Sequence, residues 1–368
     1  GTLVLAGPSL VLPEVRLASG TLTLAGSGAT ADSQTIAVQG SLWAGSLPDE
    51  GVSLAISNST LTVRDYLQIG RGNGTSGVTS SAVLTNAVVR TGNLQLGYDN
   101  QIAGNFATQV LSLDDATLTT AGLTNIGYSD GSTSTVTLSG SSAVTSGNRT
   151  LIGLTVQANG TLVVEDAASY QTAGWLAIGS GGTGAVTVRD NGRLTGTGDF
   201  NVADLLGSTG SLDISGNAGV TGGATYVGKG TGSVGTVTMT GGTFSGGNNT
   251  SFHIGSNGSG TWTQSGGDVT ATGSVVVGRY SGSAGRLAIS GGNFSHTSAG
   301  SIFNVGMDGA GELVLSAGEL TLAGASGMTI GSGSPGFGTV ALDGGVLTAR
   351  RVQGGAGAST LTINGGTI

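Results

Sequence analysis

Apolar and polar residues alternate in short runs along this chain, and glycine-rich segments interrupt the alternation. In Gly235–Gly255 (GTVTMTGGTFSGGNNTSFHIG), Val237 and Met239 point one way and the intervening threonines the other, the period of a half-buried strand. Two glycines end this strand, a second short strand follows around Phe244, and a third, Phe252–Ile254, ends at a glycine. The segment therefore predicts three short strands and three corners.

The same unit recurs along the chain. An aliphatic residue followed by a closing glycine marks the end of each third strand, and Val202-Ala203 fills the one gap in the series. From Gly45 to Gly354 there are 309 residues in twelve steps, a period of roughly 26 that is typical of solenoids. The closing glycines between these two weaker ends are Gly70, Gly97, Gly127, Gly153, Gly179, Gly228, Gly255, Gly278, Gly306 and Gly331.

The first strand of each repeat is expected to point a pair of apolar residues inward. Gln264 is the exception at such a position, and we expect it to find a hydrogen-bond partner. In one repeat the expected pair is Val83 with Leu84. The other pairs are Leu54/Ile56, Leu111/Leu113, Val136/Leu138, Leu162/Val164, Val186/Val188, Leu212/Ile214, Val237/Met239, Trp262/Gln264, Leu287/Ile289, Leu313/Leu315, Val340/Leu342 and Leu361/Ile363.

Composition supports an all-β solenoid. The 368 residues include 73 glycines and only four prolines, and charged residues make up 9%, too few for solvated helix faces. No stretch carries a sustained helical period. We expect a right-handed parallel β-helix of about 13 rungs, with three short strands per rung and no capping segments. Residues 1–368 are expected to form one continuous domain, because a solenoid buries its core between neighbouring rungs.

Charge and cysteine content narrow the classes of partner. The formal net charge is −8, and Arg350-Arg351 is the only basic cluster, so nucleic acid and anionic membrane surfaces are disfavoured. There are no cysteines, which excludes disulfides and thiolate metal sites. No apolar run approaches the length of a spanning helix, so no membrane insertion is expected.

Both ends of the sequence fall within the repeat pattern. The chain begins at a first strand and stops at Asn364–Ile368, without a polar or helical cap. Exposed strand edges are templates for further pairing. We therefore expect either a longer gene product or self-association of copies end to end.

Three runs close to the form G-x-L-x-[IL]-x-G-G-x-[LFV] show a family resemblance. They are Gly285–Phe294 (GRLAISGGNF), Gly311–Leu320 (GELVLSAGEL) and Gly338–Leu347 (GTVALDGGVL). The pattern resembles the bacterial autotransporter-associated β-strand repeat and, more broadly, the right-handed β-helix passengers of giant secreted surface proteins. The resemblance implies an extracellular or cell-surface location and a structural or adhesive role, and no C-terminal membrane barrel accompanies it in this sequence.

Carboxylates are the candidate residues for metal binding and catalysis in this sequence. Asp115, Asp166 and Asp190 occupy the corner after the first strand, where other repeats have glycine or asparagine, so a turn role is favoured. Asp166 and Asp190 fall in successive repeats and are expected to stack about 4.8 Å apart. With Glu165 beside them they are the best, weak candidate for a Ca²⁺ site.

Histidines, threonines and aromatic residues give weaker signals. His253, between inward Phe252 and Ile254, is expected to face solvent, and with His296 it supplies too few ligands for zinc. Thr-x-Thr pairs on first strands could bind ice, but charged residues interrupt their row. Aromatic residues would favour carbohydrate binding only if they gathered on one face; those considered are Trp43, Trp175, Trp262, Tyr66, Tyr170, Tyr226 and Tyr280.

The sequence therefore predicts a stiff structural or adhesive surface protein, able to stack into a fibre. A carbohydrate- or ice-binding module is the alternative, and a polysaccharide-active enzyme is a third and weaker interpretation. Variable loops are expected to set the contacts of the rod, with long insertions at 71–81, 98–108 and 128–134. We assign no catalytic, cofactor or metal residue. Surface glycans remain a candidate partner beside copies of the chain itself.

Overall fold

The fold expected from the sequence is confirmed. In a computed structural model, the chain is an all-β, right-handed parallel solenoid of about 12 rungs with a period of about 26 residues. The structure describes residues 2–5, 9–18, 20–25, 34–45, 51–70, 78–98, 107–248, 250–323 and 327–368. Much of the expected insertions at 71–81 and 98–108 therefore lies outside the described residues. Within the described ranges no helix is long and apolar enough to cross a membrane.

The chain divides into two compact units, which are described separately. Unit 1 comprises Gly1–Gly174 with Gly182–Ala185, and unit 2 comprises Trp175–Gly181 with Val186–Ile368. In each unit, strands of successive rungs pair in parallel and in register. The prediction of three strands per rung holds for most rungs, but in some rungs two of the three run on as one longer strand.

The strands of unit 1 are as follows. First strands are β1 (Thr2–Leu5), β4 (Gly20–Ala25), β7 (Val52–Ser57), β9 (Thr79–Thr85), β11 (Thr108–Asp114), β14 (Thr133–Ser139) and β17 (Asn159–Val164). Second strands are β2 (Ser9–Leu12), β5 (Gln34–Val38), β12 (Thr117–Thr120), β15 (Ala143–Ser146) and β18 (Ser169–Thr172). Third strands are β3 (Val15–Leu17), β6 (Leu42–Ala44), β13 (Thr124–Ile126) and β16 (Thr150–Ile152); β8 (Ser59–Ile69) and β10 (Val88–Leu96) join second and third.

The strands of unit 2 follow the same order. First strands are β23 (Thr209–Ile214), β26 (Val234–Met239), β29 (Ser259–Gln264), β36 (Phe337–Leu342) and β39 (Ala358–Ile363), and β20 (Thr183–Val188) spans the unit boundary. Second strands are β21 (Arg193–Gly196), β24 (Gly219–Thr221), β27 (Thr243–Gly246), β30 (Asp268–Ala271) and β37 (Val346–Ala349). Third strands are β19 (Leu176–Ile178), β22 (Phe200–Val202), β25 (Thr225–Val227), β28 (Ser251–Ile254), β31 (Ser274–Val277), β33 (Phe303–Val305), β35 (Met328–Ile330) and β38 (Val352–Gly354); β32 (Ala284–His296) and β34 (Ala310–Leu322) join first and second.

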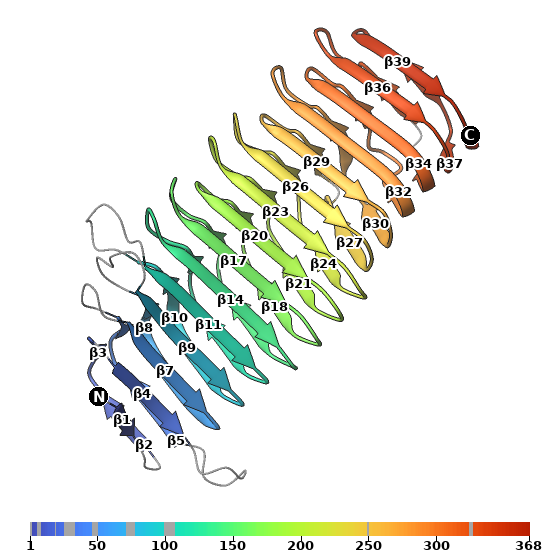
Figure 1. The fold of residues 1–368 in the computed structure, drawn as a ribbon. Coiled ribbons are helices and arrows are strands. Elements are labelled where there is room, and N and C mark those ends of the chain that lie inside the picture. Colours follow the sequence, from blue (N-terminus) through green and yellow to red (C-terminus); the bar gives the residue numbers. More distant parts are fainter. Residues whose placement is uncertain are drawn as a thin grey trace. The chain divides into compact units, whose positions relative to one another are not determined.

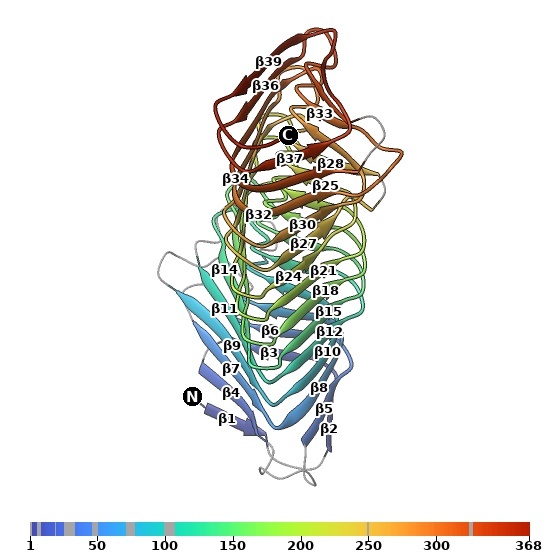
Figure 2. The same ribbon diagram turned by 90° about the vertical axis from the view of Figure 1, so that its right-hand side faces the viewer.

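Stacked rungs bury one face of each strand. First strands β23, β26 and β29 lie side by side (Figure 1), and second strands β12, β15 and β18 do the same (Figure 2). Side chains alternate between the core and the outer surface, as in β26, where Val237 and Met239 are buried and Thr236 and Thr238 are partly exposed. Burial of the inward rows between rungs is the main source of stability in such a fold.

One expected inward pair is wrong. The register pairs Leu54 of β7 with Ala82 of β9, and Ile56 with Leu84. Ala82 and Leu84 are therefore the buried pair, and Val83 is exposed. Two adjacent residues on a strand cannot share a face, because side chains alternate.

The pair in the last first strand keeps the expected register but is exposed. Leu361 and Ile363 of β39 pair with Val340 and Leu342 of β36. The side chains of Val340 and Leu342 are buried, whereas those of Leu361 and Ile363 are exposed. Pairing with β36 covers one side of β39.

The closing glycines recur because the backbone turns left-handed there. Gly255 has a φ of +72°, and a Cβ on it would lie 2.2 Å from the carbonyl oxygen of Ala284 in the next rung. Such an approach is too close for any side chain. Ala203, which fills the gap in the series, adopts the same left-handed conformation with a φ of +63°. For a residue with a Cβ this conformation is unfavourable by about 1–2 kcal/mol.

Candidate functional site

The outer face of the third strands gathers one side chain from each rung. In unit 1 the parallel register aligns Arg16 with Trp43, Trp43 with Gln68, Gln68 with Gln95, and Gln95 with Asn125. Neighbouring strands in a sheet lie about 4.8 Å apart, so these side chains form a continuous row. Gln68 and Gln95 point away from the core, yet they are only 5% and 6% exposed.

A pocket of about 360 Å³ lies over this row, and we call it the aromatic pocket. Tyr66 comes from β8, just before the third-strand segment of its rung. Tyr98 and Tyr128 directly follow the closing glycines of two successive rungs. The complete lining is Ser41, Trp43, Tyr66, Gln68, Gln95, Tyr98 and Tyr128. Four aromatic residues from four rungs thus surround two amide side chains.

The floor of the aromatic pocket is polar and incompletely hydrogen-bonded. Gln68 Nε2 donates a hydrogen bond of 2.5 Å to Gln95 Oε1. Gln68 Oε1 is buried and has no hydrogen-bond partner. Because an unpaired buried acceptor costs about 1–3 kcal/mol, a ligand that donates a hydrogen bond here would recover that loss.

The walls of the aromatic pocket offer rings at several angles. Tyr98 and Tyr128 pack edge to face, with ring centroids 4.9 Å apart and planes at 68°. Tyr66 leaves 40% of its surface exposed. Burial first, and then the neighbouring Tyr98 and Tyr66, raise the pKa of the Tyr128 hydroxyl. That hydroxyl therefore stays protonated near neutral pH and can both donate and accept a hydrogen bond.

A charged group lies at one end of the row and is already paired. The Arg16 guanidinium lies 4.0 Å from the centroid of the Trp43 ring. Arg16 Nε also contacts Glu14 Oε1 at 2.6 Å. The lining itself contributes indole, phenol, amide and hydroxyl groups. These groups stack and hydrogen-bond, which is the chemistry of binding.

The corresponding face of unit 2 is charged. The row there includes Asn201, Tyr226 and His253, aligned by register. Lys229 Nζ lies 3.0 Å from Asp204 Oδ1 and 5.2 Å from the Tyr226 ring centroid. The row of unit 2 thus carries an amide, a phenol and an imidazole, and the ion pair of Lys229 with Asp204 lies beside it.

The expectation that His253 faces solvent is wrong. Its side chain points out of the core, but it is only 2% exposed. The Tyr226 ring packs edge to face on it at 5.1 Å, and Arg279 Nη1 contacts its Nε2 at 2.6 Å. Burial, reinforced by the Arg279 charge, lowers the pKa of His253 to about 3. His253 is therefore neutral at physiological pH and accepts the hydrogen bond from Arg279.

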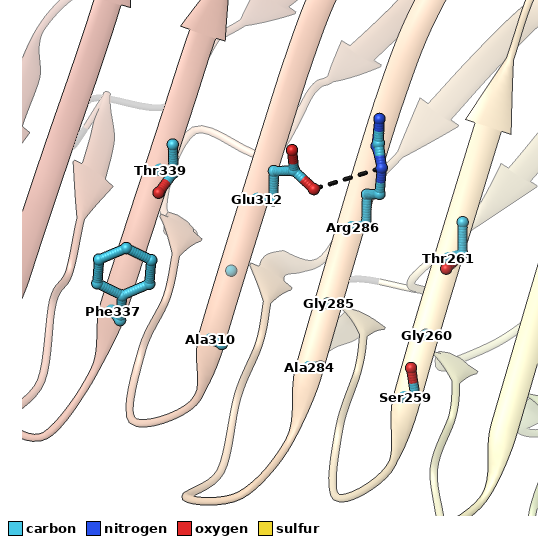
Figure 3. A pocket seen from close by; sticks show the side chains of 11 residues that line it. Ser259, Gly260, Thr261, Ala284, Gly285, Arg286, Ala310, Glu312, Phe337 and Thr339 are labelled. Atoms are coloured by element: carbon cyan, nitrogen blue, oxygen red, sulfur yellow. Dashed lines mark ion pairs between the residues drawn. The ribbon is translucent and has the colours of Figure 1, made fainter.

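A second hollow lies on the first-strand face of unit 2 (Figure 3). It spans β29, β32, β34 and β36 with a volume of about 430 Å³. Arg286 and Glu312 point toward each other across neighbouring strands, with Arg286 Nε 3.3 Å from Glu312 Oε2, and Phe337 lies to one side (Figure 3). Glycines, Ala284 and Ala310 form part of the remaining lining, and the hydroxyl residues Ser259, Thr261 and Thr339 form the rest. The hollow offers a ligand one aromatic ring, three hydroxyl groups and an exposed ion pair that is already formed.

The acidic corner residues are turn residues, as favoured from the sequence. Asp115, Asp166 and Asp190 have φ values of +49°, +54° and +58°. Asp115 Oδ1 accepts hydrogen bonds from the Ser141 backbone N–H (2.8 Å) and hydroxyl (2.7 Å), which lower the pKa of Asp115. Asp166 Oδ2 accepts one from the Gly140 N–H at 3.0 Å. Hydrogen bonds to a neighbouring rung thus explain the carboxylates of Asp115 and Asp166.

The Ca²⁺ site stays a prediction. Asp166 belongs to unit 1 and Asp190 to unit 2, and each unit is described by itself. Across the described part of the chain, no group of three or more His, Cys, Asp or Glu side chains is placed to hold a metal ion. Asp190 Oδ2 lies 3.9 Å from Arg189 Nε, a contact with a cation of the protein itself.

Two further side chains singled out in the sequence are buried and bonded. Gln264 Nε2 donates to the carbonyls of Gly267 (2.9 Å) and Asn293 (3.1 Å), so the expected partner is confirmed. His296 is buried, and its Nε2 lies 2.7 Å from Ser301 Oγ. Its burial lowers the pKa of His296. Neither residue opens onto the aromatic pocket or the hollow of Figure 3.

The structure places four of the aromatic residues singled out in the sequence in two different surroundings. Trp43 and Tyr66 line the aromatic pocket, whereas Trp262 and Tyr170 are buried in the core. Tyr98 and Tyr128 were not recognised from the sequence. The available signal was a tyrosine directly after the closing glycine in two successive repeats. The row of outward threonines is interrupted by Arg286 and Glu312, as the sequence indicates.

Comparisons of the chain with protein-family models, with curated proteins and with solved structures give no match. The resemblance to autotransporter-associated repeats therefore stays a prediction from the sequence motifs.

Proposed function

We propose that this chain is an adhesive protein of the bacterial cell exterior that binds carbohydrate through the aromatic pocket. The observation that carries the proposal is the convergence of four aromatic rings and two buried glutamine amides in that pocket. A sugar ring has apolar C–H faces that pack on aromatic rings and hydroxyl groups that need hydrogen-bond partners. Apolar and aromatic walls with a few placed polar groups are typical of small-ligand sites.

The solenoid supports this function by holding the pocket rigid. Trp43, Gln68 and Gln95 lie on three successive third strands whose backbones pair in register. Sites built on paired strands lose little conformational entropy when a ligand binds. The extracellular location and adhesive role are also what the repeat resemblance implies.

Binding to a glycan array tests the proposal. The intact chain is expected to bind a subset of glycans, and Tyr66→Ala is expected to weaken that binding at least tenfold by removing one wall. Tyr280→Ala is the matched control, because Tyr280 is 42% exposed and Tyr66 is 40% exposed, but Tyr280 lies outside the aromatic pocket. Equal glycan binding by Tyr66→Ala and the parent chain would contradict the proposal.

A further inference from the structure

Resting on the proposed function, we infer that the aromatic pocket selects an uncharged sugar unit over a uronate, sialylated or sulfated one. The lining of the aromatic pocket is uncharged. Trp43, three tyrosines, two glutamines and Ser41 carry no formal charge at neutral pH. Moving a charged group from water into such surroundings without a partner is strongly unfavourable. Binding of an acidic sugar would therefore carry this desolvation cost, and binding of a neutral sugar would not.

Arg16, the cation that the described residues place against the Trp43 ring, does not compensate for that desolvation cost. Arg16 lies over the Trp43 ring, and its guanidinium is bonded to Glu14. An acidic ligand that recruited Arg16 would have to displace the Glu14 carboxylate, which it resembles chemically. The net charge of −8 adds a weak, salt-dependent repulsion of anions from the whole chain.

The unpaired Gln68 Oε1 favours the same choice. This oxygen can only accept a hydrogen bond, and Gln68 Nε2 is committed to Gln95. A sugar hydroxyl can donate to it, whereas an ionised carboxylate or sulfate has no hydrogen to donate. Gln68 Oε1 therefore stabilises a bound hydroxyl group and disfavours an anionic group at the floor of the pocket.

The volume of the aromatic pocket limits how much of a glycan it holds. At about 360 Å³ it lies near the lower end of the range for small-ligand sites. We assign it one or two sugar rings. The Tyr128 hydroxyl, whose raised pKa keeps it protonated, supplies a further donor and acceptor for their hydroxyl groups.

The test is calorimetric titration of the intact chain with matched neutral and acidic glycans. The probes are galacto-oligosaccharides against oligogalacturonates, and chitotriose against hyaluronan and heparin fragments. At least one neutral probe is expected to bind at least tenfold more tightly than its acidic counterpart at physiological salt. Gln68→Leu is expected to weaken neutral binding roughly tenfold, the loss of one hydrogen bond. Gln171→Leu, which changes an exposed glutamine of unit 1, is expected to have no effect.

The outcomes separate this inference from the proposed function. Tighter binding of the acidic probes, still abolished by Tyr66→Ala, would overturn the charge selection and leave carbohydrate binding standing. Absence of binding to every probe and to the glycan array would overturn both. Neutral binding that Gln68→Leu leaves unchanged, in a variant with an unaltered melting temperature, would overturn the role of the Gln68 acceptor.

Discussion

The cores of the two units contain different kinds of side chain at their centres. In unit 1 a ladder of hydroxyl groups runs through the core at the corner between the second and third strands. Thr120 Oγ1 lies 3.1 Å from Thr124 Oγ1, Thr124 Oγ1 donates to Ser146 Oγ at 3.2 Å, and Thr150 Oγ1 lies 2.9 Å from the Tyr170 hydroxyl. All five side chains are fully or almost fully buried.

Unit 2 fills its core with aromatic rings instead. The Phe244 ring centroid lies 4.9 Å from that of Trp262 and 5.7 Å from that of Phe200. Phe252 and Phe294 continue the cluster, with centroids 5.7 Å apart and planes at 80°. These rings are buried and meet mostly edge to face, the arrangement that the ring quadrupole favours.

The difference shows that the same backbone repeat can hold a core with buried hydroxyl groups or a core with buried aromatic rings. Hydroxyl groups must face one another to be satisfied, so the ladder of unit 1 depends on correct alignment between rungs. Aromatic rings contribute mainly buried area and dispersion contacts, so the cluster of unit 2 depends on volume. Variants that remove one ring or one hydroxyl should therefore destabilise the units by different amounts.

The largest expected effect is in the aromatic cluster. Trp262→Ala should lower the free energy of unfolding by about 3–5 kcal/mol, because it leaves a cavity between Phe244, Phe252 and Phe294. Urea denaturation followed by circular dichroism measures the loss. Trp175→Ala, at a partly exposed tryptophan, is the matched control and should have a smaller effect. Equal losses for the two variants would contradict the cluster's importance.

A smaller effect is expected in the hydroxyl ladder. Thr150→Val keeps the shape of the side chain but removes the 2.9 Å partner of the buried Tyr170 hydroxyl, which still has Thr124 as a second partner, so we expect a loss of about 1 kcal/mol in the same assay. The double variant Thr150→Val/Tyr170→Phe removes both partners and should recover part of that loss. A double variant less stable than Thr150→Val would show that packing, not hydrogen bonding, dominates here.

The smallest expected effect concerns the charged outer face of unit 2. Folding lowers the pKa of His253 from an ordinary value of 6.5 to about 3, so the unfolded chain binds the extra proton between these pH values. His253 therefore contributes to the free energy of unfolding above pH 6.5, and this contribution is lost as the pH falls toward 3. The contribution of His253 should amount to about 1 kcal/mol between pH 7 and 5.5.

Melting temperatures across pH 4–8 check this dependence. His253→Gln should flatten the acid side of the profile. His296→Gln should change the profile in the same direction, because burial also lowers the pKa of this second histidine. An unchanged slope in His253→Gln would contradict the assignment of a neutral, buried His253.

Much of the fold could be predicted from the sequence, because strand alternation and closing glycines are local signals. Val237 and Met239 reveal a buried face by their spacing alone, and Gly255 marks a left-handed corner. The assignment of Val83 to the core failed because a rung with Ala82 as its inward residue offers a weaker apolar signal.

The aromatic pocket was harder to predict, because it depends on the register between rungs of different length. Tyr66 and Tyr98 are 32 positions apart, and Trp43 precedes Tyr66 by 23, so no single period aligns them. Burial of the outward-pointing His253 depends likewise on Arg279 in the next rung. Contacts of this kind require the three-dimensional path of the chain.

The fluorescence of Trp43 tests the central claim, that the aromatic pocket binds sugar, most directly. The variant Trp175→Phe/Trp262→Phe leaves Trp43 as the single indole of the chain. On titration with a neutral oligosaccharide that binds in calorimetry, the account predicts a saturable change in Trp43 emission with the same dissociation constant, and its loss in Tyr66→Ala. Binding in calorimetry with no change in Trp43 emission would place the sugar elsewhere and contradict the account.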